Sequence, residues 1–322
     1  MKAIQVSESG GPKVLQYEDV PDPNPGDNQA LIQLQAVGVN YIDVYTRSGL
    51  LKIPLPTIPG LEGAGTVVDV GKDVTEVVPG DLVAYAGVPR SYAEKVVAPS
   101  RRLVKLPEGI NAEIGAAAML QGMTAHYLCH SAYPLKPEDT MLVHAGAGGT
   151  GLLIIQIAKS LGARVITTVS TEAKASLAKE AGADHVILYT KEDFEEAVKE
   201  ITSGLGVQVV YESVGEATFD KSLACLARRG YIIAFGNPSG SVPPVDTATL
   251  NRRGSVFLTR PSLNDYTATR EEMLYRANDI LGWIKTGKLK LRIHDRISLK
   301  DAAEAHTQLE GRHTTGKLLL IP

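Results

Sequence analysis

The segment MLVHAGAGGTGL, residues 141–152, decides the fold of this chain. Its beginning, residues 141–144, is a short apolar run of the kind that forms a buried strand. Residues 152–161 then repeat apolar side chains at the spacing of a helix, and Gly162 stands where a left-handed helix cap is expected. The segment therefore predicts a strand, a tight turn and a helix in immediate succession.

Three glycines in this turn, Gly146, Gly148 and Gly151, match the pattern G-x-G-x-x-G. In a dinucleotide site the first allows the tight turn, the second lets the backbone approach a pyrophosphate, and the third lets helix pack closely on strand. The helix then presents free N–H groups, here those of Gly149 and Thr150, and its positive dipole end to the anion. An ordinary glycine-rich turn is the alternative, but the flanking strand and helix favour a dinucleotide site.

The composition is that of an ordinary globular enzyme, with 44% hydrophobic and 21% charged residues among 322. This length suggests about two domains, and a net charge of -3 gives no overall attraction to nucleic acid or to an anionic membrane. The two cysteines, Cys129 and Cys225, are far apart and lack metal-ligand spacing, which favours a reducing compartment. We find neither a basic-then-apolar leader nor an apolar run that could span a bilayer, so we expect a soluble, cytoplasmic protein.

Residues 1 to about 120 have the pattern of an antiparallel β domain. Residues 30–39 alternate apolar side chains with glutamine, as in a half-buried strand. Pro-Gly-Asp at 79–81 predicts a turn, because proline presets φ and glycine accepts a positive φ. Further short strands are expected at 66–70, 82–85 and 95–98.

From residue 141 onwards strands alternate with helices, which predicts an α/β fold with a doubly wound parallel sheet. Strands are expected at 164–169, 185–188, 207–211, 231–235 and 255–259, and helices at 172–181, 194–201, 219–226 and 271–285. The chain ends in a strand, 317–321. We infer a β domain over 1–122, a nucleotide-binding domain over 123–265, and a C-terminal part, 266–322, that returns to the first domain.

The end of the second nucleotide-domain strand favours NADPH over NADH. NAD-specific sites place an acidic residue there to accept from the ribose 2'-hydroxyl, whereas this chain has Ser170 and Thr171. Hydroxyls, and the ammonium of Lys174 one turn further on, suit a 2'-phosphate. Lys174 also fits an ordinary surface lysine, and Glu172 fits a first-turn residue that points to solvent.

Several motifs along nearly the whole chain point to one family. They are Gly10-Gly11-Pro12, residues 38–45 (GVNYIDVY), 47–49 (RSG), 59–65 (PGLEGAG), 120–125 (LQGMTA), 144–151, 181–183 (AGA), 213–215 (SVG), 235–237 (FGN) and 259–261 (TRP). With these motifs the chain resembles the zinc-independent quinone oxidoreductases, the zeta-crystallin-like branch of the medium-chain dehydrogenase/reductase superfamily. The resemblance implies a Rossmann NADPH-binding domain and a GroES-like antiparallel β domain.

Departures from the zinc-dependent members of that superfamily concern the metal ligands. Asn40 stands where those enzymes have a cysteine, and Gly60-Leu61-Glu62 stands where they have Gly-His-Glu. Asparagine and leucine cannot replace a thiolate and an imidazole as zinc ligands. With only two cysteines the four-cysteine structural site is missing as well, so we expect no metal and interpret Glu62 as a structural or pocket carboxylate.

The resemblance also implies which residues surround the cofactor. The nicotinamide side would be formed by Asn40, Tyr41, Asp43 and Tyr45, with Gln121, Met123 and Thr124 beneath it. The 2'-phosphate side would be formed by Ser170, Thr171, Lys174, Tyr189 and Arg312, and the rest of the groove by Ser213, Phe235, Gly236, Asn237, Phe257, Leu258, Thr259 and Arg260. For the tyrosines and Phe235, packing alone is the alternative.

The activity implied by the resemblance is hydride transfer from NADPH to a quinone, for which the protein supplies positioning and stabilisation of the developing oxygen charge. Tyr45 is the candidate donor to the reduced carbonyl, in competition with solvent, and Asn40 is the candidate for orienting the acceptor. His144 is interpreted as packing. Alternatives are reduction of an enone or enal, and a non-catalytic or RNA-binding role, which the acidic net charge disfavours. Residues 256–258 are expected to form an apolar edge strand, which a loop or helix could cover. The resemblance favours instead a homodimer that continues the sheet across this edge.

Overall fold

The computed structural model describes all residues, 1–322. The chain forms two compact units, which we call unit 1 (Met1–Met123 and Thr267–Pro322) and unit 2 (Thr124–Tyr266). Their boundaries lie within two residues of those inferred from the sequence. No helix combines the length and the apolar character needed to cross a membrane.

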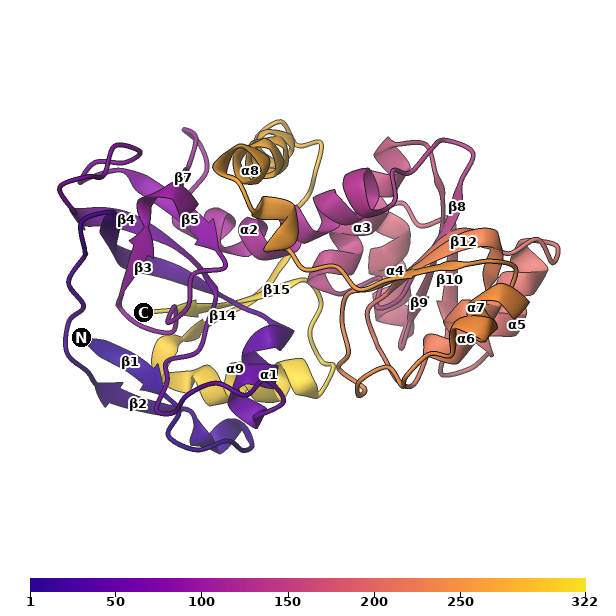
Figure 1. The fold of residues 1–322 in the computed structure, drawn as a ribbon, viewed down its shortest axis with the longest axis horizontal. Helices are drawn as coiled ribbons and strands as arrows, with labels where there is room; N and C mark the ends of the chain where they lie inside the picture. Colours follow the sequence, from indigo (N-terminus) through magenta and orange to yellow (C-terminus); the bar gives the residue numbers. More distant parts are fainter. The chain divides into compact units, whose positions relative to one another are not determined.

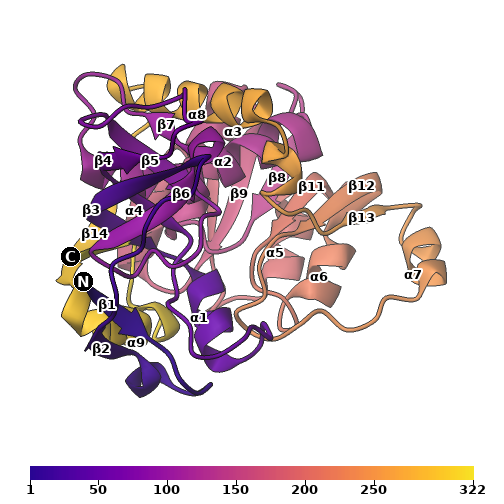
Figure 2. The same ribbon diagram turned by 60° about the vertical axis from the view of Figure 1, so that its left-hand side comes forward.

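Unit 2 is built on a six-stranded sheet in the order β10-β9-β8-β11-β12-β13, and every pair of neighbouring strands is parallel. Figure 2 shows β11, β12 and β13 side by side. The strands are β8 (Thr140–Val143), β9 (Arg164–Val169), β10 (His185–Leu188), β11 (Val207–Glu212), β12 (Leu226–Ala234) and β13 (Phe257–Thr259). The strand order reverses between β8 and β11, which is where open α/β sheets bind ligands, beyond the carboxyl ends of the strands.

Helices alternate with these strands, as the sequence predicted. They are α3 (Gly149–Ser160), α4 (Glu172–Glu180), α5 (Phe194–Ile201), α6 (Phe219–Ala224) and α7 (Thr247–Arg252). Buried side chains from the strands and from α5 and α6 form one apolar core, which includes Leu142, Ile166, Val198, Val210 and Phe219. The predicted doubly wound α/β fold is confirmed in this unit.

Unit 1 is built on a largely antiparallel sheet in the order β14-β15-β3-β4-β5-β7 (Figure 1). Strand β6 also pairs with β3. The strands of this sheet are β3 (Gln29–Val39), β4 (Glu62–Val70), β5 (Leu82–Ala86), β6 (Lys95–Pro99), β7 (Val104–Lys105), β14 (Ile293–Ser298) and β15 (Lys317–Ile321), and β1 (Lys2–Gln5) pairs separately with β2 (Gln16–Asp19). The last strand, β15, pairs antiparallel with β3, so the C-terminal segment returns to the first domain as predicted.

Three helices belong wholly to unit 1, and the unit boundary falls inside a fourth. They are α1 (Tyr41–Ser48), α8 (Arg270–Lys285) and α9 (Ala302–Glu310), and the fourth is α2 (Ala112–Tyr127). Of these four helices only α8 was predicted from the sequence, and α1, α2 and α9 were not. Helix α2 escaped because it is apolar on nearly all sides, so it lacks the one-sided stripe by which a surface helix is recognised.

Candidate functional site

The glycine-rich turn joins β8 to α3 and leaves no room for side chains at two of its glycines. A Cβ on Gly146 would lie 2.1 Å from the Thr167 hydroxyl oxygen, and one on Gly151 would lie 2.3 Å from the carbonyl oxygen of Ala145. Contacts this short do not occur between real atoms, so β9 and the turn itself require glycine at both positions.

Gly148 differs, because a Cβ there would meet only the Ala145 carbonyl oxygen, at 3.2 Å. The space beside Gly148 is therefore less crowded than that beside Gly146 and Gly151. The residue with positive φ in this turn is Ala145, at 53°, and not Gly146, to which the sequence analysis assigned the tight turn. Gly146 is needed for its close approach to Thr167 instead.

The amino end of α3 has no side-chain cap. Its N-cap residue is Gly148, and the first turn contains no acidic residue. The opening N–H groups of a helix lack intrahelical partners, and together with the dipole they attract an anion. The turn and α3 thus form the cradle that a pyrophosphate requires.

His144, at the end of β8, is sealed in a buried network. Its Nδ1 lies 2.8 Å from the Thr168 hydroxyl oxygen and its Nε2 lies 2.9 Å from that of Ser222, which donates to Glu212 at 2.6 Å. Burial lowers the pKa of His144, so the ring is neutral near pH 7. The network supports the interpretation of His144 as packing.

Glu212 closes β11 and holds the loop that follows it. Its Oε1 accepts the backbone N–H of Val214 at 2.7 Å, that of Gly215 at 3.1 Å, and the Thr218 hydroxyl at 2.9 Å. Ser213, a predicted cofactor contact, is fixed in the same loop and donates to the carbonyl of His144 at 3.2 Å. Glu212 was not predicted from the sequence, where the available signal was a carboxylate at the end of a strand rich in valine.

The carboxyl end of β9 carries the groups expected around a 2'-phosphate. Thr171 is the N-cap of α4, and its side chain accepts the backbone N–H of Lys174 at 3.3 Å. Glu172 is exposed and pairs with Lys191 at 2.7 Å, and this hydrogen bond lowers the pKa of Glu172. Lys191 is thus an additional cation near Ser170 that sequence reasoning missed, because it lies on the next strand-to-helix loop.

Tyr189 follows β10 at the same edge of the sheet. Its backbone N–H donates to Val169 at 3.2 Å, and its side chain is 41% exposed. The neighbouring Thr190 hydroxyl donates to the carbonyl of Ser170 at 3.1 Å. The structure therefore brings Ser170, Thr171 and Tyr189 together at the ends of β9 and β10.

The other predicted groove residues of unit 2 gather at the carboxyl ends of β12 and β13. Arg260 donates to Asn237 Oδ1 at 3.1 Å and to the carbonyl of Ala234 at 3.4 Å. A Cβ on Gly236 would lie 2.6 Å from the carbonyl oxygen of Ser213, so only glycine fits there. Phe257, Leu258 and Thr259 constitute the edge strand β13 itself.

In unit 1, α1 presents two tyrosines on one face. Tyr41 and Tyr45 stand one turn apart with ring centroids 6.1 Å from each other, and both are half-buried. The Tyr41 hydroxyl donates to the carbonyl of Leu309 at 3.0 Å. Asn40 is the N-cap of α1 and forms a capping box with Asp43.

Asp43 does not share the face of Tyr45, contrary to the expectation that both line one cleft. It is buried with Val44 and Arg47, whereas Ile42 is only half-buried. Its Oδ2 accepts the backbone N–H of Asn40 at 2.9 Å and the Tyr92 hydroxyl at 3.0 Å. The helical period of 3.6 explains the difference, because it places positions 43 and 47 opposite positions 41 and 45.

The amide of Asn40 is fully engaged inside unit 1. Its Oδ1 accepts from Lys317 Nζ at 2.7 Å, and its Nδ2 donates to Glu62 at 2.9 Å and to the carbonyl of Gly38 at 3.2 Å. A donor role of Asn40 towards a substrate would therefore require one of these bonds to open. Glu62, interpreted from the sequence as a structural or pocket carboxylate, is buried and bonded to Asn40 and Lys317.

Four predicted contacts lie on or beside α2 and α9. Gln121 has a buried Oε1 that accepts no hydrogen bond, and Met123 and Thr124 are buried. Arg312 follows α9 with a positive φ of 57° and is exposed. Thr124 belongs to unit 2, and the other three belong to unit 1.

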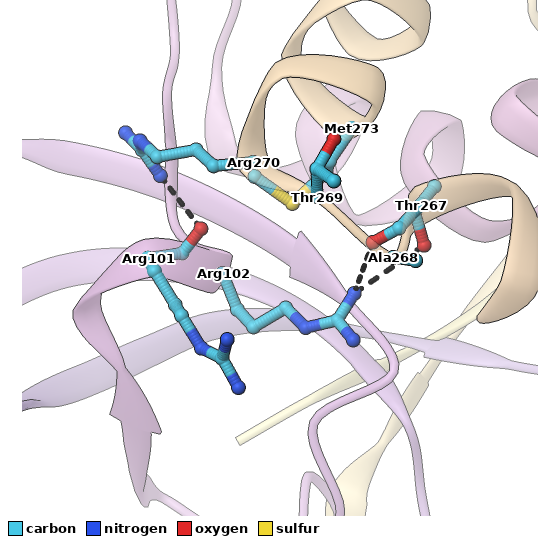
Figure 3. A pocket seen from close by; sticks show the side chains of 7 residues that line it. All are labelled: Arg101, Arg102, Thr267, Ala268, Thr269, Arg270 and Met273. Atoms are coloured by element: carbon cyan, nitrogen blue, oxygen red, sulfur yellow. Dashed lines mark hydrogen bonds between the residues drawn. The ribbon is translucent and has the colours of Figure 1, made fainter.

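Unit 1 also contains a small basic pocket beside the start of α8 (Figure 3). Arg270 donates to the carbonyls of Arg101 and Leu103, and Arg102 donates to that of Thr267. These guanidinium groups tie residues 101–103 to Thr267 and to Arg270, the first residue of α8. The pocket includes none of the predicted cofactor residues.

No cluster of three or more histidine, cysteine, aspartate or glutamate side chains is placed to hold a metal ion. At the two positions that carry zinc ligands in the metal-dependent relatives, Asn40 is engaged as described and Leu61 is apolar.

Comparison with protein-family models assigns both halves of the chain. Residues 26–108 match the alcohol dehydrogenase GroES-like domain, and residues 149–275 match the family described as zinc-binding dehydrogenase. Among curated proteins, a quinone oxidoreductase of Pseudomonas aeruginosa is 44% identical, with 100% of this chain and 99% of that protein covered. A 2-haloacrylate reductase of Burkholderia is 39% identical, covering 99% of this chain and 98% of that protein.

Solved structures agree with these relatives. The quinone oxidoreductase of Escherichia coli, determined in complex with NADPH, superimposes with a TM-score of 0.98 at 43% identity, covering 100% of both chains. Identity of this level over full length, in sequence and in structure, leaves no part of either unit outside the match. The chain therefore belongs to the quinone oxidoreductases of the medium-chain dehydrogenase/reductase superfamily, which confirms the resemblance drawn from its motifs.

Proposed function

We propose that the protein is an NADPH-dependent quinone reductase. The single observation that carries the cofactor assignment is the cradle in unit 2, where Gly146 and Gly151 allow no side chain and a Cβ on Gly148 would meet a single atom. The uncapped amino end of α3 supplies N–H donors for the pyrophosphate. The relatives that bear the name quinone oxidoreductase support the choice of acceptor.

The choice of NADPH rests on the end of β9. Ser170 and Thr171 offer hydroxyls where NAD-specific enzymes have an acid, and Glu172 is turned to Lys191. With its charge paired, Glu172 repels a phosphate less, and the ammonium of Lys174 adds attraction. We therefore assign the 2'-phosphate to this corner.

Bound NADPH supplies the hydride, and the protein's own groups handle orientation and the proton. We assign Tyr45 as the donor to the quinone oxygen that gains charge, because its phenol is half-buried and stands beside Tyr41 on one face of α1. Tyr41 packs beside it and is held by its bond to Leu309. Asn40 is assigned to position the start of α1, the helix that carries Tyr45.

The test is NADPH oxidation with simple quinones, measured by the loss of absorbance of the reduced nicotinamide. Turnover with at least one quinone, together with a lower dissociation constant for NADPH than for NADH, is the expected result. If NADPH binds but none of the quinones oxidises it, the proposed acceptor is refuted and the assignment of NADPH as cofactor stands.

Reduction of an activated carbon–carbon double bond is the second candidate. The observation that favours it is the full-length match to the 2-haloacrylate reductase. Hydride addition to a conjugated carbonyl compound develops charge on an oxygen in the same way as quinone reduction, so the same donor serves both. A panel of enones and halogenated acrylates, assayed beside the quinones, ranks the two candidates by kcat/KM.

We further propose a homodimer that continues the sheet of unit 2 across β13. Phe257 on this edge strand is 49% exposed and stacks on Tyr231 with ring centroids 4.4 Å apart. An apolar edge strand is normally covered or paired. A monomeric mass by sedimentation at micromolar concentration would refute the dimer. Both buried cysteines remain free thiols, which suits the cytoplasm as the proposed compartment.

A further inference from the structure

A buried ion pair in unit 1 joins the last strand of the chain to the strand after α1. Lys317, at the start of β15, and Glu62, at the start of β4, are both 0% exposed, and their Nζ and Oε2 atoms lie 2.5 Å apart. The same ammonium lies 2.7 Å from Asn40 Oδ1. Nothing in the proposed reaction uses these charges directly.

The Glu62 carboxylate also binds α2 and the end of β3. Its Oε1 accepts the backbone N–H of Leu120 at 2.5 Å, and its Oε2 accepts from Asn40 Nδ2 at 2.9 Å. It packs so closely over Gly38 that a Cβ there would lie 2.2 Å from Oε2. One carboxylate thus ties β15, α2 and the residue that caps α1.

The arrangement fixes the direction of the Asn40 amide. The oxygen faces an ammonium and the nitrogen faces a carboxylate, so a flipped amide would place a donor against Lys317 and an acceptor against Glu62. Asn40 caps the helix that carries Tyr45, and Leu120 precedes Gln121. The charges therefore determine the placement of two segments assigned to the site.

Stability alone is a poor explanation for this pair. Burying two charges costs much of what their attraction returns, and replacing such a pair with uncharged side chains of similar size is often neutral or stabilising. Removing one partner, by contrast, leaves an uncompensated buried charge and is strongly destabilising. What uncharged side chains cannot replace is the polarity that orients Asn40.

We propose that Lys317 is a positioning residue of the reductase, which acts through Asn40 and Glu62 to hold the start of α1, and with it Tyr45, in the orientation that turnover requires. This inference rests on the proposed function. It assigns no contact between Lys317 and substrate.

The test compares Lys317→Met with the double variant Lys317→Met/Glu62→Gln, using Lys300→Met, an exposed lysine of unit 1, as control. We expect the single variant to lose stability and the double variant to recover most of the wild-type unfolding midpoint. Turnover of the double variant should nevertheless stay roughly 10- to 100-fold below wild type, because a small misplacement near the chemistry has effects of this size. The KM for quinone should change much less than kcat.

A second readout needs no turnover. In the cofactor-free double variant, the backbone amides of α1 should exchange with solvent at least about tenfold faster than in wild type, whereas those of β3 should not change. Wild-type kcat and wild-type exchange in a stable double variant would overturn the inference. If wild type reduces no quinone, the proposed function fails, and the exchange experiment still decides the role of Lys317.

Discussion

The hydroxyl of Tyr92 lies 3.0 Å from Asp43 Oδ2, and both side chains are sealed inside unit 1. The same hydroxyl lies 3.0 Å from Nε2 of His306, whose pKa burial lowers to about 3, so this ring is neutral. A phenol has one hydrogen to give, and when it donates to Asp43 the Nε2 of His306 must donate to the phenol. The three groups form one directed chain that ends at Asp43.

The first prediction concerns stability and pH. Burial raises the pKa of Asp43 from 3.8 to about 7, so between these values the folded protein binds a proton that the unfolded chain has released. The contribution of Asp43 to the free energy of unfolding should therefore fall as pH rises from about 4 to 7. Asp43→Asn keeps an acceptor for Asn40 and Tyr92 and removes this titration. We expect its stability relative to wild type to increase by about 2 to 3 kcal/mol between pH 5 and pH 8.

Urea unfolding at both pH values measures this difference. Asp19→Asn serves as the control that should not change between the two pH values, because the hydrogen bond from Lys2 lowers the pKa of that exposed carboxylate and its titration therefore lies below pH 5 in the folded and the unfolded chain. The same stability difference between Asp43→Asn and wild type at both pH values would show that Asp43 does not titrate in this range.

The second prediction separates the glycines of the turn. In Gly148→Ala the new methyl group meets one atom at 3.2 Å, so we expect a stability change below about 1 kcal/mol but at least a tenfold loss of NADPH affinity. In Gly151→Ala the methyl group would lie 2.3 Å from a backbone oxygen, so we expect the loss of stability to dominate. Thermal unfolding and cofactor titration of both variants check this. Equal NADPH affinity in Gly148→Ala and wild type would contradict the cradle.

The alternation of unit 2 was predictable because each element has its own local pattern. The strand at 185–188 and the helix at 194–201 were predicted at their observed bounds. Helix α3 begins at Gly149, three residues before the predicted start. The predicted start was late because the first turn of the helix contains glycines, which have a low helix propensity. Its apolar spacing becomes visible only from residue 152.

Long-range polar partners were not predictable in the same way. Lys317 and Glu62 are separated by 255 positions, and no periodicity connects them. The sequence motif around Asn40 indicated a functional segment but not that Asp43 would turn to Tyr92, since this depends on the helical phase of α1. A family resemblance can therefore name the residues of a site, but the structure is needed to assign a role to each of them.

The third prediction concerns cofactor choice. Lys174→Ala should lose about 1 to 3 kcal/mol of the preference for NADPH over NADH, as expected for a charge-assisted contact. Lys179→Ala, an exposed lysine at the other end of α4, is the matched control and should leave the preference unchanged. Dissociation constants for both cofactors, measured by fluorescence quenching, provide the comparison. Equal constants for NADPH and NADH in wild type would contradict the assignment of the β9 corner.

The same corner permits a reversal. Ser170→Asp places a carboxylate where NAD-specific enzymes have one, so it should accept from a ribose hydroxyl and repel a 2'-phosphate. We expect NADPH binding to weaken by at least about tenfold while NADH binding is retained or improved. A uniform loss for both cofactors would instead indicate damage to the turn between β9 and α4.

The last prediction concerns Tyr45. Tyr45→Phe removes the hydroxyl and keeps the ring that packs beside Tyr41. Loss of one donor to a developing oxyanion costs about 10²- to 10³-fold in turnover where the charge is strongly stabilised. A quinone is reduced easily and water can hydrate its product oxygen, so we expect a smaller loss, roughly 3- to 30-fold, with little change in NADPH affinity. Steady-state kinetics with one quinone and one enone, beside a cofactor titration, provide the measurement.

The loss of turnover in Tyr45→Phe should be larger with the enone than with the quinone, because the negative charge of an enolate is less delocalised than that of a hydroquinone anion. Unchanged kcat with both acceptors would leave Tyr45 as a wall of the site and water as the source of the proton.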